Sequence, residues 1–172
     1  MNDSHASEDG SLFSLAQIQH LMRVEFNRAQ RYGYPVSCMM VAVDRLGYLR
    51  DLYGYQVKEV ILDRVIELLK AETRSSDFLG RLPDDRLLAV VPHTGPEGVA
   101  VLAERLLAGA RALEFQAGDR TLGVTLSIGY SYSMGDDTLF FDALLESADD
   151  ALSDAQTQGG DRHFKQAPGA GR

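Results

Sequence analysis

Apolar and polar positions alternate between two periods along most of this chain, one typical of helices and the other of strands. From Leu15 to Ala29 the apolar residues keep helical spacing. Ser14 and Gln17 stand three residues apart at the start of this run and predict a capping box. The continuous apolar run VSCMMVAVD follows Pro35 and predicts a buried strand. We therefore expect a helix that leads into a buried strand.

The middle of the chain predicts a second helix and then a β-hairpin. The apolar face expected for this helix consists of Val57, Val60, Ile61, Val65 and Leu68. The segments from Phe78 to Leu82 and from Leu87 to Val91 are strand-like, and the Pro-Asp-Asp-Arg turn between them has proline at a favoured position. Two antiparallel strands are thus expected to meet at residues 83–86.

Two further helices and one strand are predicted in the second half of the chain. Thr94 and Glu97 form another capping-box pattern ahead of a helix, and the segment from Leu122 to Ser133 is strand-like. Asp137 or Thr138 is expected to cap the last helix, which should end at Gly159–Gly160. The apolar faces expected for these two helices consist of Val99, Leu102, Leu106 and Ala110, and of Phe141, Leu144, Leu145, Ala148 and Leu152.

The order of these elements, αβαββαβα, predicts the α+β class, in which helices cover a central and mainly antiparallel sheet. A length of 172 residues suits one domain, and its predicted span is 11–165. Residues 1–10 and 166–172 are polar or rich in Gly, Ala and Pro, so we expect them to be disordered.

Charge and hydropathy restrict the kinds of partner. The formal net charge of −8 argues against binding of a nucleic-acid polymer, which requires dense positive charge. No apolar run approaches the roughly 18 residues of a membrane helix, and the polar start does not resemble a signal peptide. These observations predict a cytoplasmic protein without a membrane association. The single cysteine, Cys38, lies in the apolar strand and is expected to be buried.

Residue types that carry common chemistries do not cluster in the sequence. The four histidines lack metal-ligand spacing, and neither a Gly-x-Gly-x-x-Gly nor a Walker loop is present. No Ser-His-Asp or Cys-His grouping stands out. The residues therefore predict no metal site and no cofactor, and the pattern alone predicts only an α+β domain.

Several motifs together resemble the GGDEF domain of diguanylate cyclases, which join two GTP molecules into cyclic di-GMP. The segment from Asp77 to Pro92 aligns without a gap with the family's D-x-x-G-R-Y-G-G-D/E-E-F-A-V-L-L-P hairpin. The other matching motifs are Tyr53-Gly54-Tyr55, Ala103-Glu104-Arg105, Thr125-Leu126-Ser127-Ile128-Gly129 and Ala148-Asp149-Asp150-Ala151-Leu152. The resemblance covers roughly Leu12 to Lys165 and implies the family's nucleotidyl-cyclase-like fold.

The sequence departs from the family pattern at the positions that bind GTP and metal. The signature glycines, which let backbone N–H groups approach phosphates, correspond to Pro83 and Asp84, and proline has no N–H to donate. Asp85 keeps the acidic metal-binding position, but Ala42 replaces its partner carboxylate and only Asp44 remains of that pair. Further ligand positions of the family are occupied by Gly47, Arg50, Glu59, Arg86, Gln156 and Gly160.

These departures imply that the chain is not an enzyme. Two Mg²⁺ ions that bridge phosphates need more than one carboxylate. Loss of even one preorganised contact costs roughly 100- to 1,000-fold in rate. On the residues alone, Asp85 can also be a solvated turn residue, and Arg50 and Arg86 can be surface charges or part of a partner-binding surface.

A second site of the family, with the pattern R-x-x-D, is matched by Arg74 and Asp77, nine residues ahead of Pro83. Arg105 occupies the position that completes this site in the family, and Arg81 is also kept. The resemblance implies binding of cyclic di-GMP. An arginine can bond the O6/N7 edge of guanine, and a carboxylate can accept from its N1–H and N2–H₂ donors.

The leading hypothesis is therefore that the chain is a catalytically inactive receptor for cyclic di-GMP in bacterial signalling. Its expected partners are an unidentified signalling protein and, in one arrangement, a second copy of the chain in a homodimer. Three alternatives stay open. Arg74 and Asp77 can form only an exposed ion pair. The chain can be a protein-interaction scaffold that binds no nucleotide, or it can be a weak cyclase or GTP binder.

Overall fold

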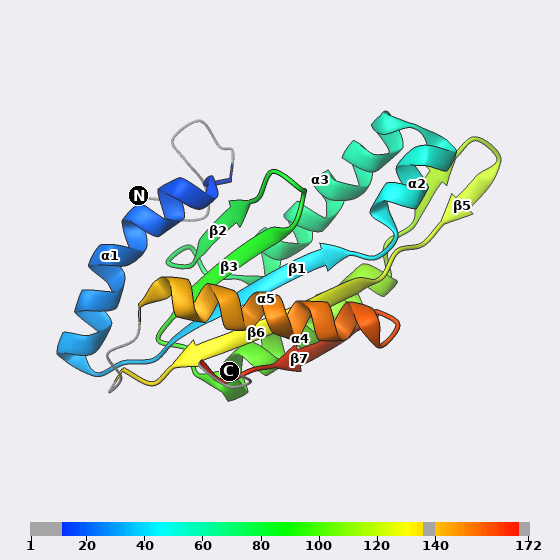
Figure 1. Cartoon of the computed structure of the whole chain (residues 1–172). Helices are drawn as coiled ribbons and strands as arrows, with labels where there is room; N and C mark the ends of the chain where they lie inside the picture. The colour runs from blue at the N-terminus through cyan, green and yellow to red at the C-terminus, as the bar shows by residue number, and fades with distance from the viewer. Residues whose placement is uncertain (1–11, 136–139, 169–172) are drawn as a thin grey trace.

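A five-stranded sheet with the order β2-β3-β1-β6-β7 forms the centre of the molecule (Figure 1). The structure is a computed structural model and describes residues 12–135 and 140–168. The strands are β1 (Val36–Val43), β2 (Phe78–Arg81), β3 (Leu87–Pro92), β6 (Leu126–Ser133) and β7 (Arg162–Lys165). All neighbours pair antiparallel except β6 and β7, which are parallel. The predicted α+β class with a mainly antiparallel sheet is confirmed.

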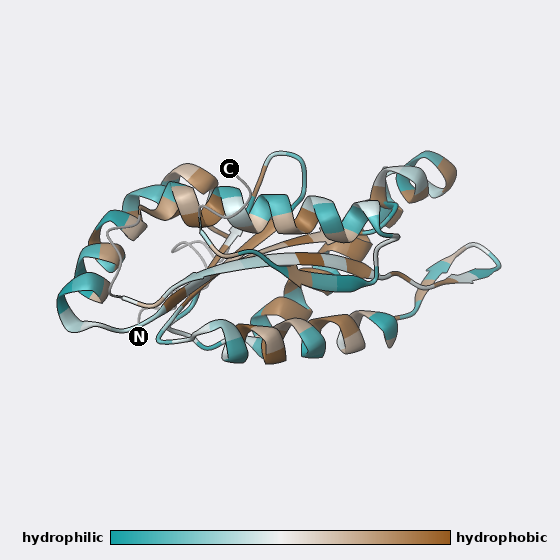
Figure 2. Ribbon diagram, turned by 60° about the horizontal axis from the view of Figure 1, so that its bottom comes forward, coloured by the Kyte–Doolittle hydropathy of each residue, from teal (hydrophilic) through white to brown (hydrophobic). Residues whose placement is uncertain are grey.

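Helices cover both faces of this sheet (Figure 2). They are α1 (Leu15–Tyr32), α2 (Leu46–Tyr53), α3 (Tyr55–Glu72), α4 (Pro96–Arg111) and α5 (Phe141–Thr157). The central strand β1 is buried along its whole length, and its side chains alternate between two apolar clusters. Met39 and Val41 pack with α3 and α4, whereas Cys38 and Met40 pack with α1 and α5. No helix in the described ranges is long and apolar enough to cross a membrane.

Local signals at several element ends are confirmed. The Ser14 hydroxyl accepts from the Gln17 N–H at 3.2 Å, and the Gln17 side chain accepts from the Ser14 N–H at 2.8 Å, so the capping box forms. The predicted hairpin is present as β2 and β3. Gly159 and Gly160, which follow the C-cap residue Gln158 of α5, have φ values of 111° and 76°, a conformation that favours glycine.

Other boundaries differ from the sequence-based expectation. Gly54, with φ of 100°, separates the short helix α2 from α3. Val60 is 52% exposed, so it does not belong to the buried face of α3. Helix α4 starts after Gly95 with Pro96 in its first turn and without a side-chain cap, so the capping box expected at Thr94 is wrong.

Three short strands were not expected. β4 (Phe115–Ala117) and β5 (Arg120–Leu122) form a separate two-stranded ribbon, which extends with α2 from one end of the sheet in Figure 1. The third, β7, continues into Gln166, whose N–H donates to the Tyr130 carbonyl at 3.0 Å. Gln166, the first residue of the tail that was expected to be disordered, is thus hydrogen-bonded to β6. The expected caps Asp137 and Thr138 and the expected disordered residues 1–10 lie outside the described residues. Helix α5 itself starts at Phe141.

Candidate ligand-binding sites

The β2–β3 hairpin has a closed end at its turn and an open end where the two strands leave it, and each end adjoins a hollow. At the closed end, the Leu82 N–H donates to the Arg86 carbonyl at 2.9 Å, and the Asp85 N–H donates to the Leu82 carbonyl at 3.0 Å. Asp85 itself has φ of 68°, a left-handed conformation that Asp tolerates better than most residues. The turn is therefore closed by its own backbone.

The Asp85 carboxylate lies between two cations. Its Oδ2 is 2.6 Å from Lys58 Nζ, and its Oδ1 is 2.7 Å from the Arg81 guanidinium. Arg81 also lies 3.5 Å from Glu59. Partial burial raises the pKa of Asp85, but the hydrogen bonds and charges of Lys58 and Arg81 outweigh it and hold that pKa below its ordinary value. Both oxygens of this acidic side chain thus have cationic partners.

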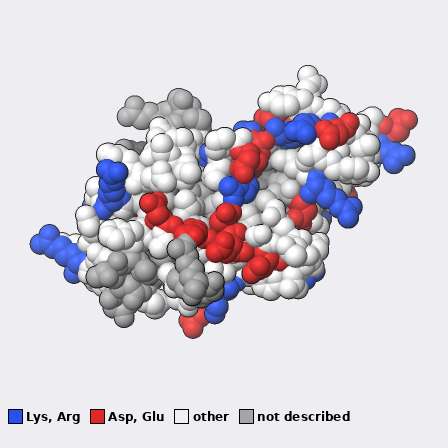
Figure 3. Space-filling view, viewed as in Figure 1, with Lys and Arg blue, Asp and Glu red and all other residues white. Residues whose placement is uncertain are grey.

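A hollow of about 540 Å³ lies beside this turn. Among the residues that line it are the family's ligand positions Ala42, Gly47, Asp84, Asp85, Arg86 and Gln156. The Arg86 guanidinium bridges Asp84, at 2.7 Å, and Asp149 on α5. Acidic side chains gather over α5 in Figure 3, because this helix carries five Asp and Glu residues and no Lys or Arg. The positive charge of Arg86 is therefore already paired with carboxylates.

Asp44, the remaining member of the family's carboxylate pair, serves a structural role. It accepts hydrogen bonds from the hydroxyls of Thr125 and Ser127, both at 2.6 Å, and from the Asp161 N–H at 2.9 Å. It does not line the hollow beside the turn. The described residues contain no group of three His, Cys, Asp or Glu side chains that could hold a metal ion. The residues present do not fit the pair of Mg²⁺ ions that the resemblance implies.

A second pocket, of about 400 Å³, lies at the open end of the hairpin and brings together Arg74, Asp77 and Arg105. Arg74 and Asp77 lie in the segment between α3 and β2, and Arg105 lies on α4. We call this the Arg74 pocket. The structure therefore places three of the four residues expected to bind cyclic di-GMP around one hollow.

The Arg74 pocket combines a fixed carboxylate with two exposed guanidinium groups. The Asp77 side chain is only 3% exposed, and its Oδ2 accepts from the Arg74 N–H at 2.8 Å. The same oxygen lies 3.9 Å from Arg74 Nε. The Arg74 guanidinium also donates to the Thr94 hydroxyl. These contacts hold the carboxylate in one orientation and leave Arg105 exposed at the rim.

Several predicted positions lie elsewhere. Arg81 is at the closed end of the hairpin with Asp85 and Glu59, and it does not line the Arg74 pocket. Arg50 pairs with the neighbouring Asp51 at 3.1 Å. Pro83 lines a separate groove between the turn and the start of α1. Arg81 is only four residues after Asp77 in the sequence, but it lies at the far end of the extended strand β2 and is therefore distant from Arg74.

Other residues of the Arg74 pocket, His93 and Thr94 among them, were not singled out from the sequence as ligand residues. His93 and Thr94 follow directly after β3 and line the hollow. Antiparallel pairing of β2 with β3 brings the residues before β2 beside those after β3, and Phe78 is paired with Val90. The predicted hairpin alone could have indicated this neighbourhood.

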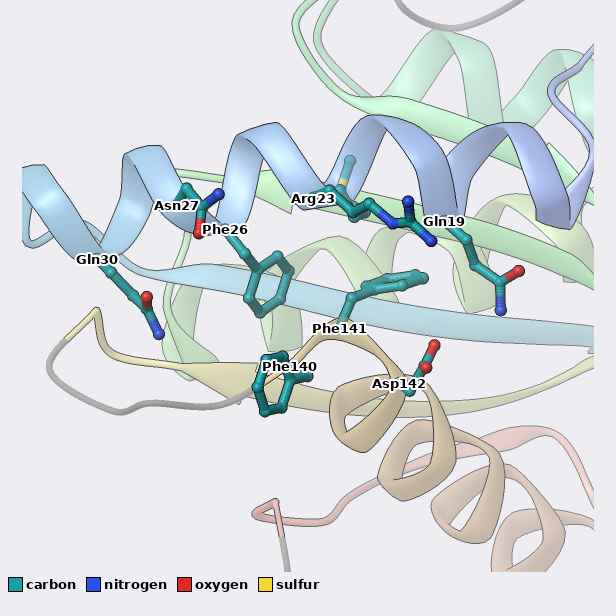
Figure 4. A pocket seen from close by; sticks show the side chains of 9 residues that line it. Gln19, Arg23, Phe26, Asn27, Gln30, Phe140, Phe141 and Asp142 are labelled. Carbon is teal, nitrogen blue, oxygen red and sulfur yellow. The ribbon is translucent and has the colours of Figure 1, made fainter.

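A further cavity, of about 520 Å³, lies between α1 and the start of α5. Figure 4 shows that Gln19, Arg23 and Asn27 reach it from α1, while Phe141 and Asp142 reach it from the first turn of α5 and Phe140 from the position just before that helix. Phe26 and Phe141 form an edge-to-face pair at 5.9 Å. None of the residues expected to bind ligand or metal lines this cavity.

The family model described as diguanylate cyclase, GGDEF domain, matches residues 11–162 of the chain. Among curated relatives, diguanylate cyclase A of Treponema denticola is 25% identical over 145 residues, which are 84% of this chain and 38% of that protein. Diguanylate cyclase DosC of Escherichia coli is 26% identical over 143 residues, which are 83% of this chain and 31% of that protein. The chain thus spans less than half the length of these relatives.

Solved structures show the same fold. Diguanylate cyclase SiaD of Pseudomonas aeruginosa, in complex with its activator SiaC, superposes with a TM-score of 0.84 at 24% identity and covers 95% of this chain and 62% of SiaD. The GGDEF domain of DgcB of Caulobacter crescentus, in complex with cyclic di-GMP, gives 0.82 at 16% identity over 98% of both chains. The active GGEEF domain of a diguanylate cyclase of Vibrio cholerae gives 0.81 at 22% identity over 92% of this chain and 98% of that one.

These comparisons correct one expectation. The departures at the signature suggested that the chain is not an enzyme. The curated relatives are named diguanylate cyclases. The comparisons point to an enzyme, and the expectation of a non-enzyme is wrong.

Proposed function

Because the chain belongs to the GGDEF domain family of diguanylate cyclases, we propose that it is a receptor for cyclic di-GMP and binds this nucleotide in the Arg74 pocket. The single observation that carries the proposal is the convergence of Arg74, Asp77 and Arg105 on one hollow at the open end of the hairpin. The likeness to DgcB, which was solved in complex with cyclic di-GMP, supports this choice of ligand.

The chemistry of the pocket suits a guanine base with its phosphate. The Asp77 carboxylate is buried and held by the Arg74 N–H, so it can accept from the N1–H and N2–H₂ donors of guanine without a large loss of side-chain entropy. A guanidinium group can bond the O6/N7 edge of guanine bidentately or stack on its plane. Arg105 would offset the negative charge of the phosphates.

The proposed role is that of a signalling module in the bacterial cytoplasm. Occupancy of the Arg74 pocket would change the contacts of the exposed α4 face with a partner protein or with a second copy of the chain. SiaD, one of the structural neighbours, was solved in complex with an activator protein. Binding of such a protein partner to the receptor would then depend on the concentration of cyclic di-GMP.

Isothermal titration of the nucleotide-free protein with cyclic di-GMP tests the proposal. We expect a dissociation constant in the micromolar range or tighter for the wild-type protein, and a loss of at least about tenfold for Arg74→Ala and for Arg105→Ala. Arg120→Ala is the matched control, because Arg120 is an exposed arginine on β5 that does not line the pocket. The control should bind as the wild type does.

Absence of binding by the folded wild-type protein would contradict the receptor and favour a scaffold that binds no nucleotide. Equal affinity of Arg74→Ala and the wild-type protein for cyclic di-GMP would show that the nucleotide binds outside the Arg74 pocket. Circular dichroism of each variant separates a lost contact from a lost fold.

The comparisons favour a second candidate function, the synthesis of cyclic di-GMP from GTP, since the curated relatives are named diguanylate cyclases. The hollow at the closed end of the hairpin contains Asp84 and Asp85 at the family's signature positions. Such activity would require the Asp85 carboxylate to exchange Lys58 and Arg81 for a metal ion. Incubation with GTP and Mg²⁺, followed by chromatography, decides the matter: formation of cyclic di-GMP supports this candidate, and unchanged GTP contradicts it.

A further inference from the structure

His93 is a histidine of the Arg74 pocket with an unusual backbone. It lies in the loop between β3 and α4 and lines the hollow with Arg74, Asp77 and Arg105. Its φ is 59°, a left-handed conformation that costs free energy for most residues other than glycine but is more common for Asn, Asp and His. Such conformations persist only where the surrounding structure enforces them, and they occur frequently at ligand sites.

Three contacts enforce the conformation of this loop. The His93 N–H donates to the Pro35 carbonyl at 2.7 Å. The Ser37 hydroxyl donates to the Thr94 carbonyl at 2.7 Å, and the Arg74 guanidinium donates to the Thr94 hydroxyl. The loop is therefore tied to β1 and to the Arg74 segment, so the position of His93 relative to the pocket is fixed.

The imidazole ring of His93 is also fixed. It stacks on the Tyr34 ring with a centroid distance of 3.8 Å and an interplanar angle of 23°. The Tyr34 hydroxyl in turn donates to the Glu25 carboxylate of α1 at 2.7 Å. Within the described part of the chain, no hydrogen bond or ion pair to a ring nitrogen of His93 is present. The ring is held by its face, which leaves its nitrogen edge available to a ligand.

We propose that His93 is a phosphate-binding residue of the Arg74 pocket, whose protonated imidazole donates a hydrogen bond to a phosphate of the cyclic dinucleotide and makes its binding tighter as the pH falls. This inference rests on the proposed function and deepens it. The ligand carries two phosphodiester charges, and a cationic donor in a fixed position interacts with such an acceptor more strongly than a neutral one. Histidine is the side chain whose ordinary titration falls in the physiological range.

Several other ionisable groups lie around His93. From the segment between α3 and β2 these are Glu72, Arg74 and Asp77, and from α4 it is Arg105. On the α1 side, burial and the Glu25 carboxylate raise the pKa of Tyr34, so its hydroxyl stays protonated. Carboxylates and guanidinium groups titrate well outside about pH 5.5 to 8. Among the described residues that line the pocket, His93 is the only histidine.

Titration of the full chain with cyclic di-GMP at about pH 5.5 and about pH 8 tests the inference. We expect the wild-type protein to bind roughly 3- to 10-fold more tightly at the lower pH, because one additional charge-assisted hydrogen bond is then available. His93→Asn should bind with equal affinity at both pH values, since asparagine tolerates the left-handed backbone and carries no titrating group. His20→Asn is the control, because His20 is an exposed histidine on α1 outside the pocket, and it should retain the dependence.

Tyr34→Phe provides a second readout, because it keeps an aromatic ring beneath His93 and removes only the hydroxyl bonded to Glu25. Its pH dependence should match that of the wild type. Wild-type binding that does not change with pH, or a dependence retained by His93→Asn, overturns the inference while the receptor stands. No binding at either pH overturns both.

Discussion

At the residue scale, Asp85 shows how one carboxylate of the signature turn is used in this fold. Each of its oxygens contacts a cation, Lys58 at 2.6 Å and Arg81 at 2.7 Å. Charge-assisted contacts of this kind stabilise the folded state most when the side chains are partly withdrawn from water. The turn is therefore expected to contribute to stability as well as to the shape of the hollow beside it.

The contribution of Asp85 should depend on pH in one direction. The contacts lower its folded-state pKa below the unfolded value of about 3.9. The stabilisation is therefore complete above that value and is lost as the pH falls through the lowered folded-state pKa. We expect Asp85→Asn to have a lower urea midpoint than the wild type near neutral pH and a smaller further decrease on acidification. Equal acid sensitivity of the two proteins would contradict the role given to these contacts.

Arg74→Lys tests whether the geometry of Arg74, and not only its charge, matters. Lysine keeps the positive charge but lacks the planar fork with which Arg74 would bond the guanine edge in the proposed complex. We expect cyclic di-GMP to bind at least about tenfold more weakly to this variant than to wild type, as measured by isothermal titration. Unchanged affinity would show that Arg74 acts as a point charge at a phosphate.

At this scale, the sequence indicated part of the set of residues that surround the Arg74 pocket, and their binding of a nucleotide stays a prediction. Arg74 and Asp77 are near neighbours along the chain, so their juxtaposition follows from spacing alone, and Arg105 was added through the family motif. Arg81 does not line the Arg74 pocket, because successive residues of an extended strand lie about 3.3 Å apart and β2 therefore separates it from Arg74. His93 was missed because its approach to Arg74 depends on the pairing of β2 with β3.

At the scale of elements, the contact between β6 and α5 depends on Gly129. A Cβ atom at this position would lie 2.0 Å from the Leu152 nitrogen and 2.3 Å from the Ala148 carbonyl oxygen. Both are backbone atoms of α5, so no side-chain rotation can relieve the overlap. The helix can lie on this strand only because residue 129 has no side chain.

Gly129→Ala should therefore destabilise the protein by at least about 3 kcal/mol or prevent its folding. The measurement is urea-induced unfolding of the purified variant, or its yield as soluble protein. Gly123→Ala is the matched control, because a Cβ there meets no atom within 4 Å, and its midpoint should stay within about 0.5 kcal/mol of wild type. A small effect of Gly129→Ala would mean that α5 can shift away from β6.

The elements that the sequence missed are short and lie at edges. β7 has four residues, Arg162 to Lys165, two of them exposed, and so it lacks the apolar run or alternation that identifies a strand. Its parallel pairing with β6 requires α5 as the connection, which spacing along the chain does not reveal. By contrast, the long amphipathic helices and the buried strand β1 have strong periodic signals and were predicted correctly.

At the scale of the whole molecule, the two ends of one hairpin carry different chemistry. The closed end places Asp84, Asp85 and Arg86 beside the acidic helix α5. The open end places Arg74, Asp77 and His93 together with Arg105 of α4. The two hollows share no lining residue, so substitutions can test each site separately.

The most direct test of the receptor is to locate cyclic di-GMP on the isotopically labelled protein by the amide chemical shifts of its NMR spectrum. We predict that the largest changes fall on residues 74–77, on residues 93–98 and on Arg105, which surround the Arg74 pocket. Changes confined to residues 84–86 and Asp149 at the closed end, or no changes at saturating nucleotide, would contradict a receptor that acts through the Arg74 pocket.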